Sequence, residues 1–304
     1  MKRLSVLVPI HNRLAVTRAG LTHLLFHINK YSATANPKLF ITIVVVDDGS
    51  TDGSGAWIES HFPEVELLYG NGNLWWSGAI NQASSYAIDI LNAEYLLLWN
   101  DDIEASDDYF FQLEAILADP QFSEAIIGSK IMDATRRHIV WADSGKFNKF
   151  SGRLQMLRNH EKDFIECDWL NGMGTIVPAK AILHQKLWWD AQRFPQYYGD
   201  TDFILRAKRK GFQILLFSKL VIYNKTEFTG LHRKAGLRAT LKSLTSQRSF
   251  FNIGKDLRFY SRHGYFPFAY FGMIRKYGRF FFECLKETLA LKRQDGYNKP
   301  DISE

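Results

Sequence analysis

Three acidic clusters hold the side chains best suited to chemistry in this sequence. They are Asp47-Asp48, Asn100-Asp101-Asp102 and Asp200-Thr201-Asp202. Aspartate and asparagine are also common at turns and helix N-caps, which is the structural alternative for any single cluster. Carboxylate oxygens are preferred ligands of hard divalent cations, so the three clusters together indicate a cation that neutralises a bound diphosphate.

The sequence excludes several other kinds of site. Its two cysteines, Cys167 and Cys284, are too few for a Cys-rich zinc site, and its nine histidines form no His-Glu-x-x-His pattern. It also contains neither a Gly-x-x-x-x-Gly-Lys-Ser/Thr loop nor a Gly-x-Gly-x-x-Gly motif after a strand, so neither an ATPase phosphate loop nor a Rossmann dinucleotide site is supported. We therefore expect any metal to be bound by oxygen.

The elements that must position these clusters alternate regularly in the first hundred residues. Short apolar runs typical of buried strands end directly at the first two clusters. We predict strands at residues 4–9, 40–46, 65–69 and 95–99, and helices at about 17–28 and 78–92. This alternation favours a parallel, doubly wound α/β sheet whose ligands lie beyond the carboxyl ends of the strands.

The pattern loosens after residue 102 and changes again near residue 230. We predict helices at about 107–118 and 201–210, strands at 125–131, 175–178 and 212–217, and weaker strands near Val140 and Cys167. From Lys234 onward the chain reads as helices rich in Arg, Lys, Phe and Tyr. The predicted organisation is a catalytic domain over residues 1–230 and a basic, aromatic helical extension over residues 231–304.

Four segments resemble the successive motifs of family 2 glycosyltransferases with the GT-A fold: residues 6–13 (VLVPIHNR), 44–52 (VVVDDGSTD), 97–102 (LLWNDD) and 198–206 (YGDTDFILR). The resemblance covers about residues 3–225, and it is closest to the rhamnosyltransferase-like members of bacterial surface polysaccharide synthesis. It implies an α/β fold of GT-A (Rossmann-like) type, with a mostly parallel sheet flanked by helices and a C-terminal helical extension.

The resemblance also implies roles on the donor side. Asp47 or Asp48 would receive the base of a UDP- or dTDP-sugar, Asn100 would touch ribose or phosphate beside Asp101, and Asp102 would ligate Mg²⁺ or Mn²⁺. Asn100 replaces the first acid of the family's Asp-x-Asp motif, which leaves the metal one charge fewer. The other residues implied to line the nucleotide-sugar pocket are Pro9, His11, Arg13, Asn73, Trp76, Gly78 and Asn81. For Trp75-Trp76, two core aromatics that open a helix are the structural alternative.

On the acceptor side, the resemblance implies that Asp200 is the general base of an inverting enzyme. A carboxylate at a helix N-terminus is held ionised and can accept a proton from an attacking hydroxyl. Gly199 replaces the family's Glu, and Asp202 is either an acceptor residue or a plain first-turn acid. Trp169, Asn171, Gly172 and Gly174 would approach the acceptor, with a structural turn as the alternative. Asn224 stands where many GT-A enzymes have a metal-binding His, so His232 is the candidate second metal ligand.

The basic residues are concentrated near the C-terminus. Residues 1–232 have 23 Lys and Arg against 26 Asp and Glu, whereas residues 233–293 have 14 against 3, a net charge of +11. Eleven aromatic residues lie between Phe259 and Phe282. This mixture favours an anionic membrane surface as partner. The alternatives are a packed helical layer or a surface that pairs two subunits in a homodimer. Nucleic acid is not expected as a partner, since no nucleic-acid-binding motif accompanies the charge.

The residues and the resemblance together favour an inverting hexosyl- or deoxyhexosyltransferase that acts on a glycan acceptor, which we expect to be lipid-linked. Residues 4–10 are too short for a signal peptide and no apolar run approaches the roughly 18 residues that span a bilayer. We therefore expect a cytoplasmic enzyme, peripheral at the inner face of the membrane. The departures at Asn100 and Gly199 leave a catalytically silent nucleotide-sugar- or glycan-binding protein as an alternative. A metal-dependent nucleotidyltransferase is a third hypothesis.

Overall fold

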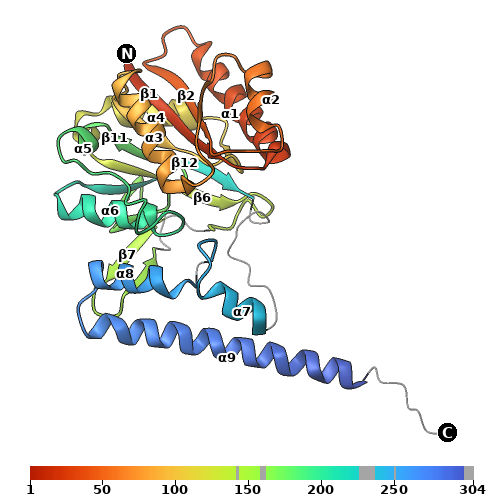
Figure 1. The fold of residues 1–304 in the computed structure, drawn as a ribbon. Coiled ribbons are helices and arrows are strands. Elements are labelled where there is room, and N and C mark those ends of the chain that lie inside the picture. The colour runs from red at the N-terminus through yellow and green to blue at the C-terminus, as the bar shows by residue number, and fades with distance from the viewer. Residues whose placement is uncertain (142–143, 158–161, 226–236, 250, 298–304) are drawn as a thin grey trace. The chain divides into compact units, whose positions relative to one another are not determined.

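The protein consists of two units, each described here by itself. The computed structural model describes residues 1–141, 144–157, 162–225, 237–249 and 251–297 (Figure 1). The first unit comprises residues 1–147 and 154–228, and the second comprises residues 148–153 and 229–304. Residues 148–153, at the tip of a β-hairpin, thus belong with the C-terminal helices. The sequence did not predict this association. The expected boundary at residue 230 lies outside the described residues.

The first unit is built on one large sheet with the strand order β3-β2-β1-β4-β11-β6-β12-β5, in which β9 also pairs with β12. The strands nearest the N-terminus are runs of β-branched and apolar residues, which suit a sheet buried on both faces. The strands are β1 (Lys2–Ile10), β2 (Leu39–Asp47), β3 (Glu66–Tyr69), β4 (Tyr95–Leu98), β5 (Ile103–Ala105), β6 (Ile126–Asp133), β9 (Phe164–Glu166), β11 (Thr175–Pro178) and β12 (Ile214–Asn224).

The sheet is mostly parallel, which confirms the predicted fold class. Strands β1 to β4 pair in parallel, and so do β6 and β12. Strand β11 runs antiparallel to both of its neighbours, β4 and β6, so it reverses direction in the middle of the sheet. The carboxyl ends of β1, β2 and β4 therefore meet at one edge, where the first two acidic clusters begin.

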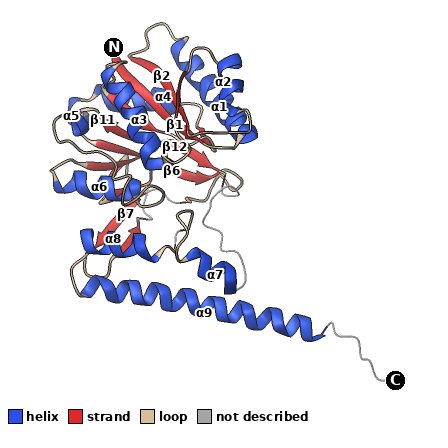
Figure 2. Cartoon of the chain, viewed as in Figure 1, coloured by secondary structure: helices blue, strands red, loops and turns tan. Residues whose placement is uncertain are grey.

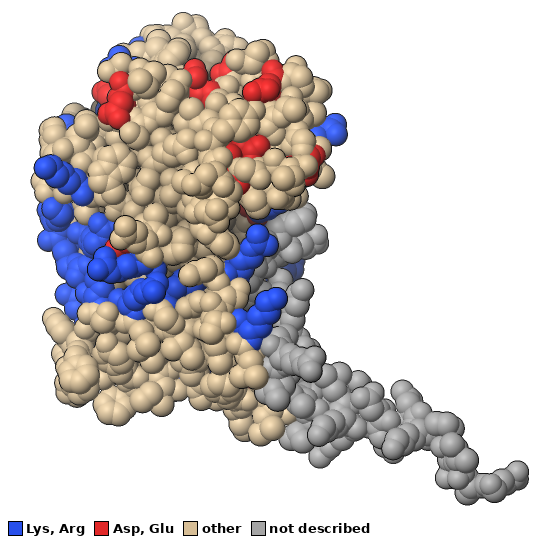
Figure 3. Space-filling model, in the orientation of Figure 1, with Lys and Arg blue, Asp and Glu red and all other residues tan. Residues whose placement is uncertain are grey.

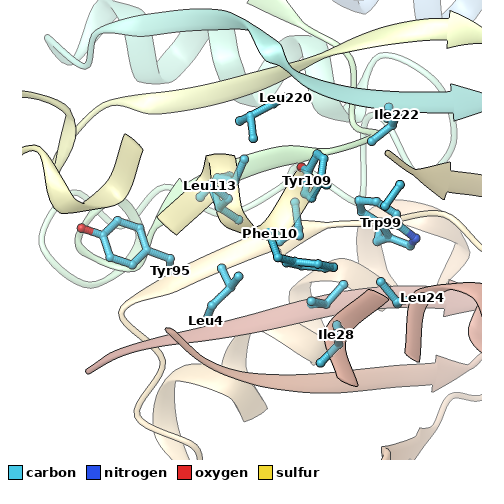
Figure 4. Close-up of a cluster of buried hydrophobic side chains, with 14 of the residues drawn as sticks. Leu4, Leu24, Ile28, Tyr95, Trp99, Tyr109, Phe110, Leu113, Leu220 and Ile222 are labelled. Atoms are coloured by element: carbon cyan, nitrogen blue, oxygen red, sulfur yellow. The ribbon is translucent and has the colours of Figure 1, made fainter. Parts of the chain in front are cut away.

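Helices cover both faces of this sheet (Figure 2). Alternate residues of β1 point into two separate cores: Leu4, Val6 and Val8 into one, and Leu7 into the other. The first core packs against α1, α2 and α4, and the second against α3, α5 and α6. Figure 4 shows part of the first core, with side chains of α1 and α4. The helices are α1 (Leu14–Ser32), α2 (Ser54–His61), α3 (Trp75–Asp89), α4 (Tyr109–Ala118), the 3₁₀ turn η1 (Pro120–Phe122), α5 (Lys180–Leu183) and α6 (Gly199–Arg209).

Several elements differ from the sequence expectations. Helix α2 was missed because its eight residues are too few to show a clear apolar period. Strand β12 extends to Asn224, seven residues beyond the predicted end, with a register shift between Phe217 and Val221. A second sheet has the order β10-β7-β8, and its members are β7 (Ser144–Asn148), β8 (Arg153–Met156) and β10 (Trp169–Leu170). The weak strands predicted near Val140 and Cys167 lie close to β7 and β10, whereas β8 was missed.

The second unit is helical, with α7 (Leu237–Ser243), α8 (Ile253–His263) and α9 (Phe268–Tyr297). Its core contains buried aromatic side chains of α8 and α9, among them Phe259, Tyr277 and Phe280. The buried Asp256 forms an ion pair of 2.7 Å with the half-buried Lys276. None of the helices in the described parts of the chain is long and apolar enough to cross a membrane.

Candidate functional site

The carboxyl ends of β1 and β2 are joined by hydrogen bonds that position His11. The Asp48 amide donates to Ile10 O at 3.0 Å, which continues the parallel pairing past the strand ends. The His11 Nδ1–H donates to Asp48 O at 2.7 Å, while His11 Nε2 accepts from the side-chain Nδ2 of Asn12 at 3.1 Å. These two partners assign the neutral imidazole tautomer. Pro9 lies two positions before His11, opposite Val46 in the sheet.

Asp47 and Asp48 are both buried but have different partners. Asp47 Oδ1 accepts from the Ser50 amide at 2.8 Å and so shapes the turn that follows β2. Both oxygens of Asp48 accept backbone hydrogen bonds, from the Gly72 amide at 2.8 Å and from the Trp75 amide at 2.9 Å. Asp48 thus closes the loop that precedes α3. Asp47 and Asp48 are the two candidates for binding the nucleobase. Of these, only Asp47 has a carboxylate oxygen, Oδ2, that accepts no hydrogen bond from the described residues.

Arg13 pairs with both carboxylates of the second cluster. Its Nη2 donates to Asp102 Oδ2 at 2.8 Å and lies 3.4 Å from Asp101 Oδ1, while the Thr17 hydroxyl donates to Asp101 Oδ2 at 2.9 Å. Burial raises the pKa of Asp101 to about 6, with a smaller contribution from Asp102 and against the effect of Arg13. Burial would lower the pKa of Arg13, but the two carboxylates raise it above its ordinary value. The three charges therefore form one coupled group.

This group fits a divalent cation that takes most of its ligands from a substrate. Asp102 Oδ1 has no hydrogen bond from the described residues, so it can ligate a cation while Oδ2 stays with Arg13. Among the residues that the structure describes, no three His, Cys, Asp or Glu side chains are grouped as a metal site. Mg²⁺ is commonly held by one or two carboxylates together with phosphate oxygens and water. The candidate ligand His232 lies outside the described residues.

The structure brings donor-side and acceptor-side candidates together at Trp76. Its indole Nε1–H donates to Asn100 Oδ1 at 3.3 Å. The same ring covers Gly172, where an added Cβ would lie 2.7 Å from Trp76 Cζ2 and 3.1 Å from Asp200 Cβ. Residues predicted separately from four segments of the sequence are therefore neighbours in one site of the first unit.

Asp200 sits in the first turn of α6 with its carboxylate held by backbone amides. Its Oδ2 accepts from the Gly172 amide at 2.8 Å, and its Oδ1 accepts from the Thr201 amide at 2.7 Å. Burial raises its pKa above the ordinary value of an aspartate, against the effect of these hydrogen bonds. A carboxylate with a raised pKa binds a proton more strongly, which is the property that a general base needs.

Strained backbone conformations gather around these residues. Asn12, Trp75, Tyr197 and Tyr198 all have positive φ angles between 51° and 61° without being glycine. Such conformations cost about 1–3 kcal/mol each and persist only where the surroundings enforce them. Tyr197 and Tyr198 directly precede α6 and so determine where Asp200 lies.

Gly199 is explained by the space around it. A Cβ at this position would overlap Ser77 Oγ and lie 3.0 Å from Phe194 O. Ser77 in turn donates its hydroxyl proton to Phe194 O at 2.6 Å and its amide proton to Pro195 O at 3.0 Å. The start of α3 therefore packs directly against the start of α6, and this contact leaves no room for a glutamate at position 199.

Two candidate residues have structural partners instead of facing the site. The Asn81 side chain donates to Trp189 O at 2.8 Å and accepts from the Trp189 amide at 3.0 Å. Asp202 is fully buried and accepts from Arg206 Nε at 2.8 Å, one helical turn away. Their hydrogen bonds thus favour a role in holding the 188–206 region, and Asp202 corresponds to the plain first-turn acid.

The remaining candidates lie on the borders of the site. Trp169 is buried in β10, and the Asn171 carbonyl accepts from the Thr175 hydroxyl. Gly174 has a φ of +66° and donates its amide proton to Leu98 O at 2.8 Å, two positions before Asn100. Gly78 packs against Leu74, and Asn73 is exposed. Thr17 was missed by the sequence analysis; its position four residues after Arg13, on the same helical face, is the signal that could have indicated it.

Solved structures share this fold. A structure of S. aureus TarS aligns with a TM-score of 0.53 and 17% identity over 86% of this chain and 43% of that one. TarS 1–349 aligns with a TM-score of 0.51 and 15% identity over 84% and 68%. The mixed sheet and the acidic edge thus define a protein of the GT-A structural class.

The family follows from the sequence match. A family model described as glycosyl transferase family 2 matches residues 5–173, more than half of the chain, and the protein belongs to this family. The low-salt glycan biosynthesis hexosyltransferase Agl10 of Haloferax volcanii is 26% identical over 175 residues, which are 56% of this chain. The matched region spans 54% of that relative's length.

The raised pKa of Asp101 predicts how stability changes with pH. Because the unfolded Asp101 ionises near 3.8 and the folded one near 6, this group favours folding below pH 4 and loses that contribution as the pH rises to 6. The difference corresponds to about 3 kcal/mol. We expect Asp101→Asn to gain stability relative to the wild type over this interval. Urea unfolding at pH 4 and pH 7, with chelator and without nucleotide, measures it.

Asp52 is the matched control with the opposite sign. Burial would raise its pKa, but hydrogen bonds from Ser54 and from the Leu14 amide lower it below the ordinary value. Asp52→Asn should therefore lose stability relative to the wild type as the pH rises toward 4, and this difference should change little between pH 4 and pH 7. Wild-type and Asp101→Asn curves that stay parallel between pH 4 and pH 7 would contradict the burial argument.

A double-mutant cycle tests the packing at Gly199. Gly199→Ala should destabilise the protein by about 1–3 kcal/mol because its methyl group overlaps Ser77 Oγ. Ser77→Ala removes that oxygen and leaves its own Cβ at an ordinary 3.5 Å, so the double variant should regain part of the loss. Thermal unfolding of the four proteins measures the coupling. Strictly additive effects would show that Ser77 is not the obstacle.

Proposed function

We propose that the protein is an inverting glycosyltransferase that transfers a hexosyl or deoxyhexosyl residue from a UDP- or dTDP-sugar to a hydroxyl group of a glycan. The observation that carries this proposal is the grouping of Asp200, Gly172, Trp76 and Asn100 beside the Arg13–Asp102 pair. In this proposal the half-buried Asp200 carboxylate is the general base, and its position beside residues suited to a diphosphate supports that role.

The relatives support the donor class. TarS 1–349 structures in complex with UDP and with UDP-GlcNAc align over 86% of this chain with a TM-score of 0.50. The Haloferax relative is named as a hexosyltransferase of glycan biosynthesis. A role in surface polysaccharide synthesis, with a rhamnosyltransferase-like specificity, belongs to this proposal.

In the proposed reaction, Asp200 accepts the proton of the acceptor hydroxyl. The acceptor oxygen then forms a bond to the anomeric carbon as the bond from that carbon to the β-phosphate oxygen breaks, and the nucleoside diphosphate leaves. Mg²⁺ or Mn²⁺ bound at Asp102 would supply Lewis-acid neutralisation of the diphosphate charge. Arg13 holds Asp102 in place, and the Gly172 and Thr201 amides orient the Asp200 carboxylate.

The proposal also includes a lipid-linked acceptor and a peripheral position at the inner face of the membrane. The support is the composition of the C-terminal segment, which combines the +11 charge with aromatic residues. An enzyme bound to a membrane shares its surface with a lipid-linked substrate, which raises their rate of encounter.

Nucleotide binding tests the donor site. We expect UDP or dTDP to raise the melting temperature, and Mn²⁺ to increase the shift because a cation held by Asp102 would neutralise the diphosphate charge. Asp102→Ala should lose the effect of the metal, whereas Asp163→Ala, an exposed acid paired with Lys219, should keep it. A melting temperature indifferent to every nucleoside diphosphate would count against a donor site. Release of diphosphate from a nucleoside triphosphate would indicate a nucleotidyltransferase instead.

Removal of the base tests the mechanism. Asp200→Asn keeps the shape of the side chain, so turnover should fall about 10²- to 10⁴-fold with little change in donor binding. Since the pKa of Asp200 is raised, wild-type activity should fall on acidification at a pH above the ordinary value for aspartate, near 3.9. Initial rates between pH 4 and pH 8 measure this limb.

Asp202→Asn and Asp163→Asn are the controls for this experiment. Asp202→Asn should lower stability through the loss of the Arg206 pair, and Asp163→Asn should change neither stability nor turnover. Near-normal turnover of Asp200→Asn would assign the base elsewhere. Donor binding without any transfer or donor hydrolysis by the wild type would favour a catalytically silent binding protein.

A further inference from the structure

The outer face of α9 carries a continuous apolar stripe. At 100° per residue, Phe268, Phe271, Ile274, Phe281, Phe282 and Leu285 all fall within an arc of about 140°. All six side chains are exposed; Phe271 and Ile274 are 64% and 63% accessible. Gly278 lies at the centre of the arc, where an added Cβ would meet nothing. The opposite side of the helix holds the buried Tyr277, Phe280 and Cys284, so the stripe is not needed for the core.

A second segment of the chain extends this stripe. Phe150, at the tip of the β7–β8 hairpin, is exposed and packs edge-on against the rings of Tyr265 and Phe268, with ring centroids 5.1 and 6.0 Å apart. Phe266, in the turn before α9, is 81% accessible. Gly272 lets the hairpin approach α9, since a Cβ there would overlap Ser151 O. Two parts of the sequence more than a hundred residues apart thus contribute to one apolar surface within the second unit.

Cations border the stripe along one side. Arg275, Arg279 and Lys286 are exposed and follow the edge of the arc on α9. Lys286 Nζ lies 4.8 Å from the centroid of the Phe282 ring, and Lys149 Nζ lies 5.8 Å from that of Tyr265. On the face of the molecule drawn in Figure 3, uncharged side chains make up most of the surface where Figure 1 shows the described part of α9. The pattern is an apolar face with a basic rim.

We propose that this stripe is the surface by which the protein binds an anionic lipid bilayer, with α9 lying in the plane of the headgroups. The proposal rests on the proposed function, whose membrane association it assigns to one helix face. Exposed Phe side chains insert among the acyl chains near the headgroups, and Arg and Lys at the rim pair with lipid phosphates. The positive charge beside the stripe favours an anionic bilayer over a second copy of the chain. A second copy of the chain would bring the same cations toward one another, whereas an anionic surface complements them.

Substitutions in the stripe test the proposal. We expect the full chain to sediment with phosphatidylglycerol/phosphatidylcholine vesicles at low salt, and more weakly with phosphatidylcholine alone. The double variant Phe271→Asp/Ile274→Asp should bind about a hundredfold more weakly, because it removes two inserted side chains and adds two negative charges. Phe26→Asp/Ile90→Asp, which changes two equally exposed apolar residues of the first unit (62% and 61%), should bind like the wild type.

Each other outcome has a definite reading. Wild-type binding by the stripe variant would overturn the proposal, and so would a stripe variant that loses thermal stability, since its side chains would then be covered within the chain. A wild type that is dimeric without vesicles and becomes monomeric through the stripe substitutions would assign the surface to a second copy. UDP-induced thermal stabilisation, measured on the same proteins, separates this inference from the donor site. If UDP stabilises none of the proteins, including the wild type, while the wild type still binds vesicles, the result would count against the proposed function only.

Discussion

The candidate site depends on burying two adjacent carboxylates at the edge of a parallel sheet. Asp101 and Asp102 lie three and four residues after the end of β4, and moving such charges out of water is costly unless they are paired. Arg13, from the start of α1, supplies the opposite charge, and the Thr17 hydroxyl binds a further oxygen. Gly20 completes the arrangement, since a Cβ at that position would overlap Asp101 O. The same residues of α1 and its N-cap therefore pack against the sheet edge and compensate the buried charge of the site.

The carboxylates of Asp48 and Asp200 accept hydrogen bonds from backbone amides and have no ion pair among the described residues. They therefore fix loops in place, whereas Asp101 and Asp102 pair with Arg13. Asp48 holds the loop before α3 through two amides, and Asp200 joins α6 to the Gly172 turn. A carboxylate that accepts hydrogen bonds from backbone amides fixes a loop relative to a neighbouring helix or strand, and it needs no flexible Arg or Lys side chain to do so. The strained residues Trp75 and Tyr198 lie at these two junctions, where the hydrogen bonds can enforce their conformations.

Local patterns predicted much of the fold, and tertiary contacts account for what was missed. Apolar runs predicted β1, β2, β4 and β11 to within about two residues at each end, because strands buried on both faces need such runs. The motifs also indicated which side chains gather at the sheet edge. The partners of Asn81 could not be read in the same way, since its amide binds a backbone 108 positions away. Likewise, no local signal joins the tip of the β7–β8 hairpin to the C-terminal helices.

The two departures from the family pattern have different physical meanings. Gly199 is a packing requirement, because Ser77 occupies the space of any side chain there. Asn100 concerns charge: with Asp101, Asp102 and one Arg13, the site has a formal charge of −1, and an aspartate at position 100 would add a third carboxylate with no further cation among its described contacts. The amide oxygen of Asn100 instead accepts the Trp76 indole proton. The substitution thus lowers the negative charge that a diphosphate would meet and, through Trp76, ties this donor-side position to the ring that covers Gly172 beside Asp200.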